Sequence, residues 1–296
     1  MANQPSPPSS KYKMALLGLI WVLLAMAPVI PAVDYYVMDL PDRAYSADHE
    51  LMKPSGLVGH GLGILGSAMM IFGVATYSLR KRSSFLARFG KLSSWLTFHI
   101  FLCTLGPFYV TLHTTFRFGG IVSISFWSMV AVVVSGLFGR YVYARIPKSL
   151  NGVFKDATSL LSQQQAQLDK LREAYGDSAF LSELEATLLI QNRDGLQMSI
   201  PAAVAASIRT PFERRGYRSR VEARTRKLPT GAPMRDALLE QSIRCWNLNR
   251  QLLLLKPFQR AFGYWHVFHL PLAIIMFLIL FIHVGIAIAF GYGWIF

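Results

Sequence analysis

Cysteine is nearly absent from this chain of 296 residues. Only Cys103 and Cys245 occur, and they lie far apart in the sequence. Two cysteines are too few for a disulfide framework or for a cysteine-ligated zinc or iron–sulfur site. The C-x-x-C-H motif is also missing, which excludes covalent attachment of haem through that motif.

Charge is scarce as well, and it is unequal in sign. Charged residues make up 16% of the chain, hydrophobic residues make up 53%, and the mean hydropathy is +0.35. These values are typical of a membrane protein rather than a soluble domain. The net charge of +14 comes from basic residues that flank apolar runs, which is the positive-inside pattern. Because no nucleic-acid-reading motif accompanies this charge, we expect a lipid bilayer as the partner and no nucleic acid.

Five apolar runs are long enough to cross a hydrocarbon core, which takes about 20 residues. The predicted spans are residues 14–33, 56–79, 92–116, 121–143 and 263–290. The loop charges place the N-terminus and the basic loop after residue 79 in the cytoplasm, and the acidic segment 34–53 outside. The C-terminus is then periplasmic, in a bacterial inner membrane. A secretory signal peptide cleaved after Ala32 is the alternative to the first span.

Residues 147–257 differ from the rest in being polar, and we interpret them as a mostly helical cytoplasmic insert. Helical patterns cover 158–175, 182–191 and 234–255, and Ser199-Ile-Pro201 predicts a helix start with proline at the first position. The basic stretch 209–227 suits anionic lipid headgroups or an acidic partner. The expected fold is an all-α membrane protein with five transmembrane helices, divided into 1–146 (spans one to four), 147–257 (insert) and 258–296 (span five).

Two histidine pairs stand out within the apolar runs. His99 and His113 lie in the third span, and His269 and His283 lie in the fifth, each pair fourteen positions apart. Fourteen residues are close to four helical turns, so both members of a pair face the same way about 21 Å apart. Ionisable side chains inside a membrane are costly and usually functional. Both spans run outward, so His99 and His269 share the cytoplasmic depth and His113 and His283 share the outer depth. This matching suits two irons with paired axial imidazoles; four independent hydrogen-bonding histidines are the alternative.

This arrangement resembles the dihaem cytochrome b family, which includes the respiratory cytochrome b and the membrane domains of ferric reductases and NADPH oxidases. In that family, alternate helices of a four-helix bundle carry histidine pairs at this spacing. The resemblance implies that spans two to five form the bundle and hold two non-covalent haem b groups. It assigns His99 with His269 to the inner haem iron and His113 with His283 to the outer one. It covers the membrane part of the chain and not the insert.

The function implied by the resemblance is transmembrane electron transfer by a subunit of an oxidoreductase complex. The chain carries no flavin, nicotinamide or iron–sulfur site of its own, so partner subunits are expected. We expect exchange between a quinone and either a cytochrome c or an iron–sulfur or flavin protein. One alternative is a membrane domain that reduces ferric iron or oxygen directly. Another is a haem-free transporter or anchor whose histidines carry protons or bind a metal.

Four further residues are candidates for contacts around these haems. Arg117 and Arg140 lie where propionates would emerge, and arginine binds carboxylates with two parallel bonds; both also fit as topology-setting charges. His266 is rotated by about 100° from the face that His283 shares with its partner. We interpret it as a propionate or quinone contact, with inner ligation as the alternative. His60, between two glycines near the outer end of span two, is an alternative outer ligand, a quinone contact or a proton acceptor.

Glycine is dense in the second span, where Gly59, Gly63, Gly66 and Gly73 occur among others. Small residues allow close helix packing in membranes. They would equally allow a flat macrocycle to approach the backbone. The sequence alone leaves both explanations open.

Overall fold

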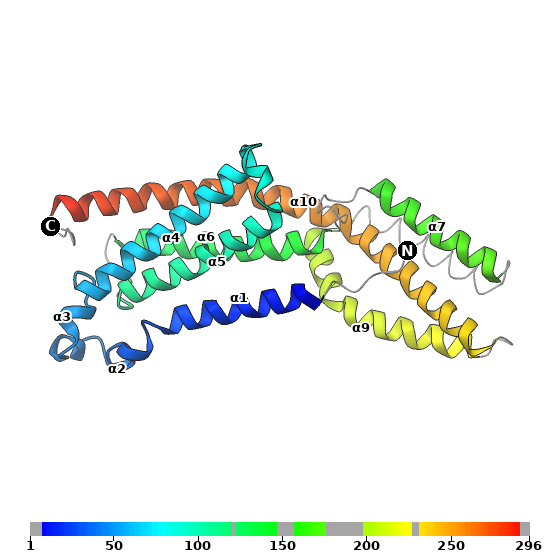
Figure 1. Ribbon diagram of the computed structural model, residues 1–296, viewed down its shortest axis with the longest axis horizontal. Coiled ribbons are helices and arrows are strands. Elements are labelled where there is room, and N and C mark those ends of the chain that lie inside the picture. Colours follow the sequence, from blue (N-terminus) through cyan, green and yellow to red (C-terminus); the bar gives the residue numbers. More distant parts are fainter. Residues whose placement is uncertain (1–7, 120–121, 147–156, 176–197, 227–230, 291–296) are drawn as a thin grey trace. The chain divides into compact units, whose positions relative to one another are not determined.

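The computed structural model describes residues 8–119, 122–146, 157–175, 198–226 and 231–290, and every regular element within them is a helix (Figure 1). Five of these helices are long and apolar enough to cross a membrane. The five candidate spans include the helices α1 (Pro8–Met26), α4 (Leu57–Arg82), α5 (Leu92–His113), α6 (Val122–Arg145) and α10 (Ala232–Ala289). The prediction of an all-α chain with five candidate membrane helices is confirmed.

The chain divides into two compact units, and the division falls inside α6 and α10. Unit 1 is residues 1–136 with 269–296, and unit 2 is residues 137–268. Unit 1 therefore holds α1, α4 and α5, most of α6 and the end of α10. The predicted domain boundaries, which follow the expected membrane topology, stay a prediction.

Helices α4 and α5 form the central antiparallel pair of unit 1. Their closest approach is at Gly66 and Gly106, where a Cβ built on either glycine would lie 2.6 Å from the carbonyl oxygen of the other. A real side chain at either position would force the helices apart. The glycine-rich sequence of α4 thus serves close helix packing, as small residues commonly do in membranes.

Side chains from other helices cover this pair. Helix α1 is tied to α5 by two hydrogen bonds: the Trp21 Nε1–H donates to Thr104 Oγ1 (3.1 Å), and the Tyr109 hydroxyl donates to the Leu24 carbonyl (2.8 Å). A buried apolar cluster consists of Met70 of α4, Phe126 and Met129 of α6, and Met276 of α10. Side chains of α4, α6 and α10 therefore meet in one core within unit 1.

The segment between α1 and α4 consists of short helices: η1 (Ile30–Ala32), α2 (Val33–Val37), η2 (Asp42–Tyr45) and α3 (His49–Met52). Arg43 is its buried centre, only 5% exposed. The guanidinium donates to the carbonyls of Tyr36 (2.7 Å), Met38 (2.9 Å) and Thr115 (2.6 Å). Arg43 thereby fastens this segment to the turn that follows α5. The short helix η3 (Leu86–Arg88) lies in the opposite loop, between α4 and α5.

Unit 2 is built on α7 (Ala157–Tyr175), α9 (Ile200–Thr225) and the first part of α10. Ser199 caps α9 by accepting a hydrogen bond from the Ala202 amide, and the helix begins at Ile200, as the serine–proline pattern predicts. The predicted helix 182–191 lies outside the described residues. The core of the unit includes Val142, Leu160, Ala203 and Phe258, which come from four different helices.

Predicted boundaries differ from the structure in three places. The first span was predicted to reach residue 33, but α1 ends at Met26 and is followed by the short helices η1 and α2. The third span was predicted to continue to Phe116, but α5 ends at His113 because Thr115 (φ 49°) and Phe116 (φ 62°) are left-handed, which stops a helix. The fifth span and the preceding 234–255 helix were predicted as separate elements. They form one continuous helix, α10, which contains both Pro257 and Gly263.

Candidate haem-binding site

His99 is oriented by a backbone carbonyl of the neighbouring helix. Its Nδ1 lies 3.1 Å from the carbonyl oxygen of Gly73 on α4. A carbonyl oxygen only accepts hydrogen bonds, so Nδ1 must carry the proton. In the neutral imidazole this leaves the Nε2 lone pair free to bind a metal. The Tyr77 ring, 5.4 Å away between centroids, packs beside it.

His113 repeats this arrangement at the other end of α5. Its Nδ1 lies 2.8 Å from the carbonyl oxygen of Gly59. Gly59 and Gly73 are themselves fourteen residues apart, so the antiparallel α4 matches the two histidines with two acceptors. Histidines that bind metals commonly donate their second ring N–H to a carbonyl in this way, which fixes the tautomer and the orientation of the ring.

Two histidines, His60 and His283, lie near His113. The rings of His60 and His113 have centroids 6.2 Å apart, and both His60 and His283 are close enough to act electrostatically on His113. These residues come from α4, α5 and α10. The structure therefore brings His113 together with its predicted partner His283 and with the alternative ligand His60.

His269 is held from α6 rather than from α4. Its Nδ1 lies 3.2 Å from the Ser135 hydroxyl oxygen, and a Cβ on Gly136 would lie 3.7 Å from its Cε1, an ordinary contact. His99 and His269 belong to the same unit and have separate hydrogen-bond partners. Ser135 was not among the residues singled out from the sequence, because a serine in an apolar helix gives no signal of its own.

Glycine makes room for the His113 ring. A Cβ on Gly63 would lie 2.8 Å from both Cγ and Nδ1 of His113, so only glycine lets this ring lie against α4. At Gly73 a Cβ would lie 3.1 Å from Cys103 Sγ and from Leu102 Cβ. A side chain at either glycine would collide with residues of α5. Their role as packing residues is thus visible directly.

The other predicted contact residues are more peripheral. Arg117 is exposed in the turn after α5. Arg140 is half-buried beside Tyr143, and His266 is exposed beside Phe262, with ring centroids 6.3 Å apart. Arg140 and His266 belong to unit 2, whereas the four axial-ligand candidates belong to unit 1.

One functional candidate was missed by sequence reasoning, namely Arg43. In the sequence it is an isolated basic residue inside an acidic segment, a pattern that predicts a solvent-exposed side chain. In the structure it is buried, packs over the rings of Tyr35 and Phe116, and binds the Thr115 carbonyl two residues beyond His113. It therefore fixes the end of α5, next to His113.

No protein-family model, curated protein or solved structure matches the chain. Within the part of the chain that is described, no three His, Cys, Asp or Glu side chains are arranged to hold a metal ion. The structure gathers His60 and His283 around His113, whereas the printed contacts of His99 and His269 are with α4 and α6 respectively.

Proposed function

We propose that this chain is a dihaem b-type cytochrome, the electron-transfer subunit of a membrane redox complex. In this proposal α4, α5, α6 and α10 form the haem bundle, with residues 147–257 on the cytoplasmic side of a bacterial inner membrane. His99 with His269 would hold the inner haem, and His113 with His283 the outer one. The observation that carries the proposal is the paired orientation of His99 and His113 by two carbonyls with the same fourteen-residue spacing.

The residues fit two haems on chemical grounds. Neutral imidazoles with a protonated Nδ1 present Nε2 to the iron, and a hydrogen bond at Nδ1 raises the basicity of the ligand. Ser135 supports His269 at the same ring atom. When bound, the haems supply one-electron redox chemistry, and their potentials depend on ligand identity, hydrogen bonding and burial.

The role of the chain is then to hold two redox centres at different membrane depths. His99 and His113 are separated by about 21 Å of helix. Electrons would pass between the two faces, exchanged with a quinone and with a cytochrome c or an iron–sulfur or flavin subunit. His60, beside the outer pair, and His266, exposed on α10, would be contacts for a quinone or for propionates, and Arg117 and Arg140 would bind propionates.

Electron paramagnetic resonance of the oxidised, purified protein tests the proposal. Two low-spin bis-imidazole signals are expected, and His113→Ala and His269→Ala should each remove a different one. His49→Ala is the matched control, because His49 bonds to the Tyr35 hydroxyl in the outer loop and should leave both signals intact. Retention of both signals in His113→Ala and His269→Ala would refute the ligand assignment. Absence of any haem signal would favour histidines that carry protons or bind another metal.

A further inference from the structure

The start of α9 carries an exposed surface that the electron-transfer proposal does not use. Ile208 is 59% exposed and Phe212 is 69% exposed, although both are large apolar residues. They are four residues apart and therefore lie on the same side of the helix. The sequence from 200 to 221 holds five arginines, at positions 209, 214, 215, 218 and 220, and one acidic residue, Glu213. We name Ile208 and Phe212, with Arg209, Arg214 and Arg215, the α9 patch.

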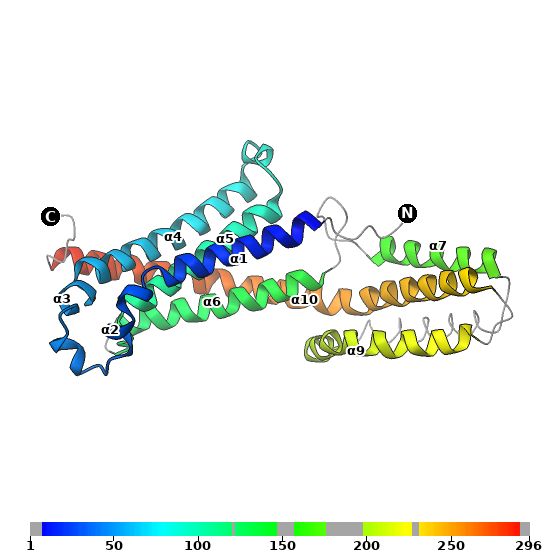
Figure 2. The same ribbon diagram turned by 60° about the horizontal axis from the view of Figure 1, so that its bottom comes forward.

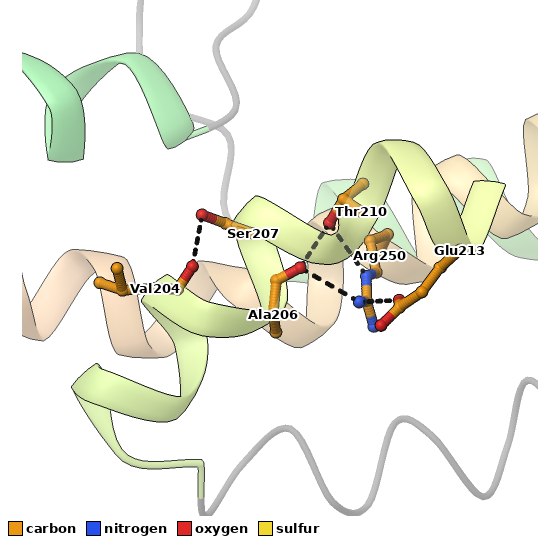
Figure 3. A network of polar contacts seen from close by, with 6 residues as sticks. All are labelled: Val204, Ala206, Ser207, Thr210, Glu213 and Arg250. Atoms are coloured by element: carbon orange, nitrogen blue, oxygen red, sulfur yellow. Dashed lines mark hydrogen bonds and ion pairs between the residues drawn. The ribbon is translucent and has the colours of Figure 1, made fainter. Parts of the chain in front are cut away.

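The positive charge of the patch is not neutralised from within the helix. Glu213 forms an ion pair with Arg250 of α10, and the same guanidinium reaches the Ala206 carbonyl (3.3 Å) and the Thr210 hydroxyl (3.3 Å) (Figure 3). Glu213, the single carboxylate of residues 200–221, is thus paired with Arg250, which is not part of the patch. Arg209, Arg214 and Arg215 are exposed.

The beginning of α9 is anchored near the ends of the apolar stretches of α6 and α10, where charged residues first appear beside them. Ser207 Oγ lies 2.6 Å from the Tyr141 hydroxyl of α6, and Arg260 of α10 donates to the Met198 carbonyl (2.7 Å). Ala203 is buried against Val142 and Phe258. Tyr141 and Arg260 lie at the cytoplasmic ends of the two apolar helices, which is the depth of the lipid headgroups in the proposed topology.

The direction of the helix changes at this point. Figures 1 and 2 show that the first turns of α9 run across the direction of the neighbouring part of α10, while the rest of α9 runs along it. Pro211 lies inside α9, and a proline within a helix removes one hydrogen bond and causes such bends. The patch spans this proline, because Ile208 and Arg209 precede Pro211 and Phe212, Arg214 and Arg215 follow it.

We propose that the α9 patch binds the cytoplasmic leaflet directly, with Ile208 and Phe212 in the interfacial layer and the neighbouring arginines on anionic lipid headgroups. An apolar face flanked by arginines is the composition of interfacial helices. Negative headgroups attract such segments, and each basic residue strengthens the association about fivefold. The proposal rests on the membrane location of α6 and α10 and is independent of whether haem is bound.

The test is depth-dependent fluorescence quenching in the full chain. Ile208→Cys and Phe212→Cys would be labelled with a small fluorophore, and the chain placed in nanodiscs that contain lipids with a nitroxide near the headgroup. Met234→Cys is the matched control, since Met234 is 42% exposed but lies twenty-four residues, about 36 Å of helix, before Phe258. The unsubstituted chain, treated with the same reagent, gives the background from Cys103 and Cys245.

Strong quenching is expected at positions 208 and 212 and not at 234. It should be greater with phosphatidylglycerol present than in phosphatidylcholine alone, and Arg209→Gln with Arg215→Gln should remove that difference. Quenching at 208 and 212 no greater than at 234 would overturn the proposal. A response that ignores phosphatidylglycerol would overturn the role of the arginines. Labels that are unquenched by lipid, yet shielded from aqueous iodide in native membranes, would assign the patch to a protein partner instead.

Discussion

The carbonyl acceptors of Gly59 and Gly73 explain at the residue level why the histidine spacing matters. Two antiparallel helices keep register only if their matching positions recur with the same period, and here both recur after fourteen residues. Each histidine of α5 is therefore bound to α4 by its own Nδ1. The ring orientation is set before any ligand arrives, which is how outer hydrogen bonds support metal sites.

Gly63→Ala should displace the His113 ring, because the new Cβ would lie 2.8 Å from two of its ring atoms. The hydrogen bond to Gly59 would be lost, and affinity for the outer haem should fall about 10–100-fold. Haem titration of apoprotein measures this. Gly285→Ala is the control, since open space surrounds Gly285, and equal affinities in the two variants would contradict the assignment.

Arg43→Met should destabilise the C-terminal end of α5. The substitution leaves the buried Thr115 carbonyl, and those of Tyr36 and Met38, without their charged donor. Hydrogen bonds to charged groups contribute about 1.5–3 kcal/mol each, so a loss of several kcal/mol in the free energy of unfolding is expected. Thermal unfolding in detergent measures it. Arg88→Met, at an exposed position in the loop between α4 and α5, should change stability little, and a comparable loss of stability there would argue against a specific role of Arg43.

At the scale of helices, the α4–α5 contact should be sensitive to added volume. Gly66→Ala would place Cβ 2.6 Å from the Gly106 carbonyl oxygen, which is backbone and cannot rotate away. Overpacking of this kind costs about 1–3 kcal/mol. Gly18→Ala on α1 is the comparison, because nothing lies within 4 Å of its Cβ. Chemical denaturation of both variants should separate them, and a neutral Gly66→Ala would show that the helices are not tightly packed there.

Tyr217 gives unit 2 a predictable response to alkaline pH. Its ring stacks on Trp246 of α10 (5.7 Å between centroids), and its hydroxyl is buried with no hydrogen-bond partner in the described chain. Burial raises the pKa of the Tyr217 phenol above its usual value of 10.0; nearby Cys245 also raises it and Arg220 lowers it. The folded chain keeps the proton that the unfolded chain releases, so this stabilisation is complete below pH 10.0 and is lost as the pH rises through the folded-state pKa.

Tyr217→Phe should therefore flatten the decline in unfolding temperature at high pH while leaving the value at neutral pH unchanged or slightly raised. Differential scanning fluorimetry from neutral to alkaline pH measures the unfolding temperatures of the variant and of the unsubstituted chain. A decline as steep in Tyr217→Phe as in the unsubstituted chain would show that other groups cause it.

The sequence predicts the helices well and their contacts poorly. Apolar length and flanking charge predict all five candidate spans, and the Ser199–Pro201 pattern predicts the start of α9, because these signals are local. The hydrogen bond of Ser135 to His269, the burial of Arg43 and the continuity of α10 depend on what lies across from each residue. The acceptors Gly59 and Gly73 lie between these two cases. Their fourteen-residue spacing is visible in the sequence, but its meaning depends on knowing that His99 and His113 contact α4.

For the whole molecule, the proposal describes a chain that holds two redox centres in unit 1 and needs partners to use them. Unit 2 has its own core, its own capped helix and, in our proposal, its own attachment to the lipid surface. Loss of that attachment should leave haem content unchanged, because none of the four axial-ligand candidates belongs to unit 2.

Extraction and quantification of haem from the purified full chain, expressed with haem supplied, tests the central claim most directly. The account predicts two non-covalent haems per chain, with a reduced-minus-oxidised difference spectrum of the b type. One haem per chain would contradict one of the two histidine pairings and bring His60 or His266 forward as a ligand. No haem in folded protein would contradict the cytochrome proposal as a whole.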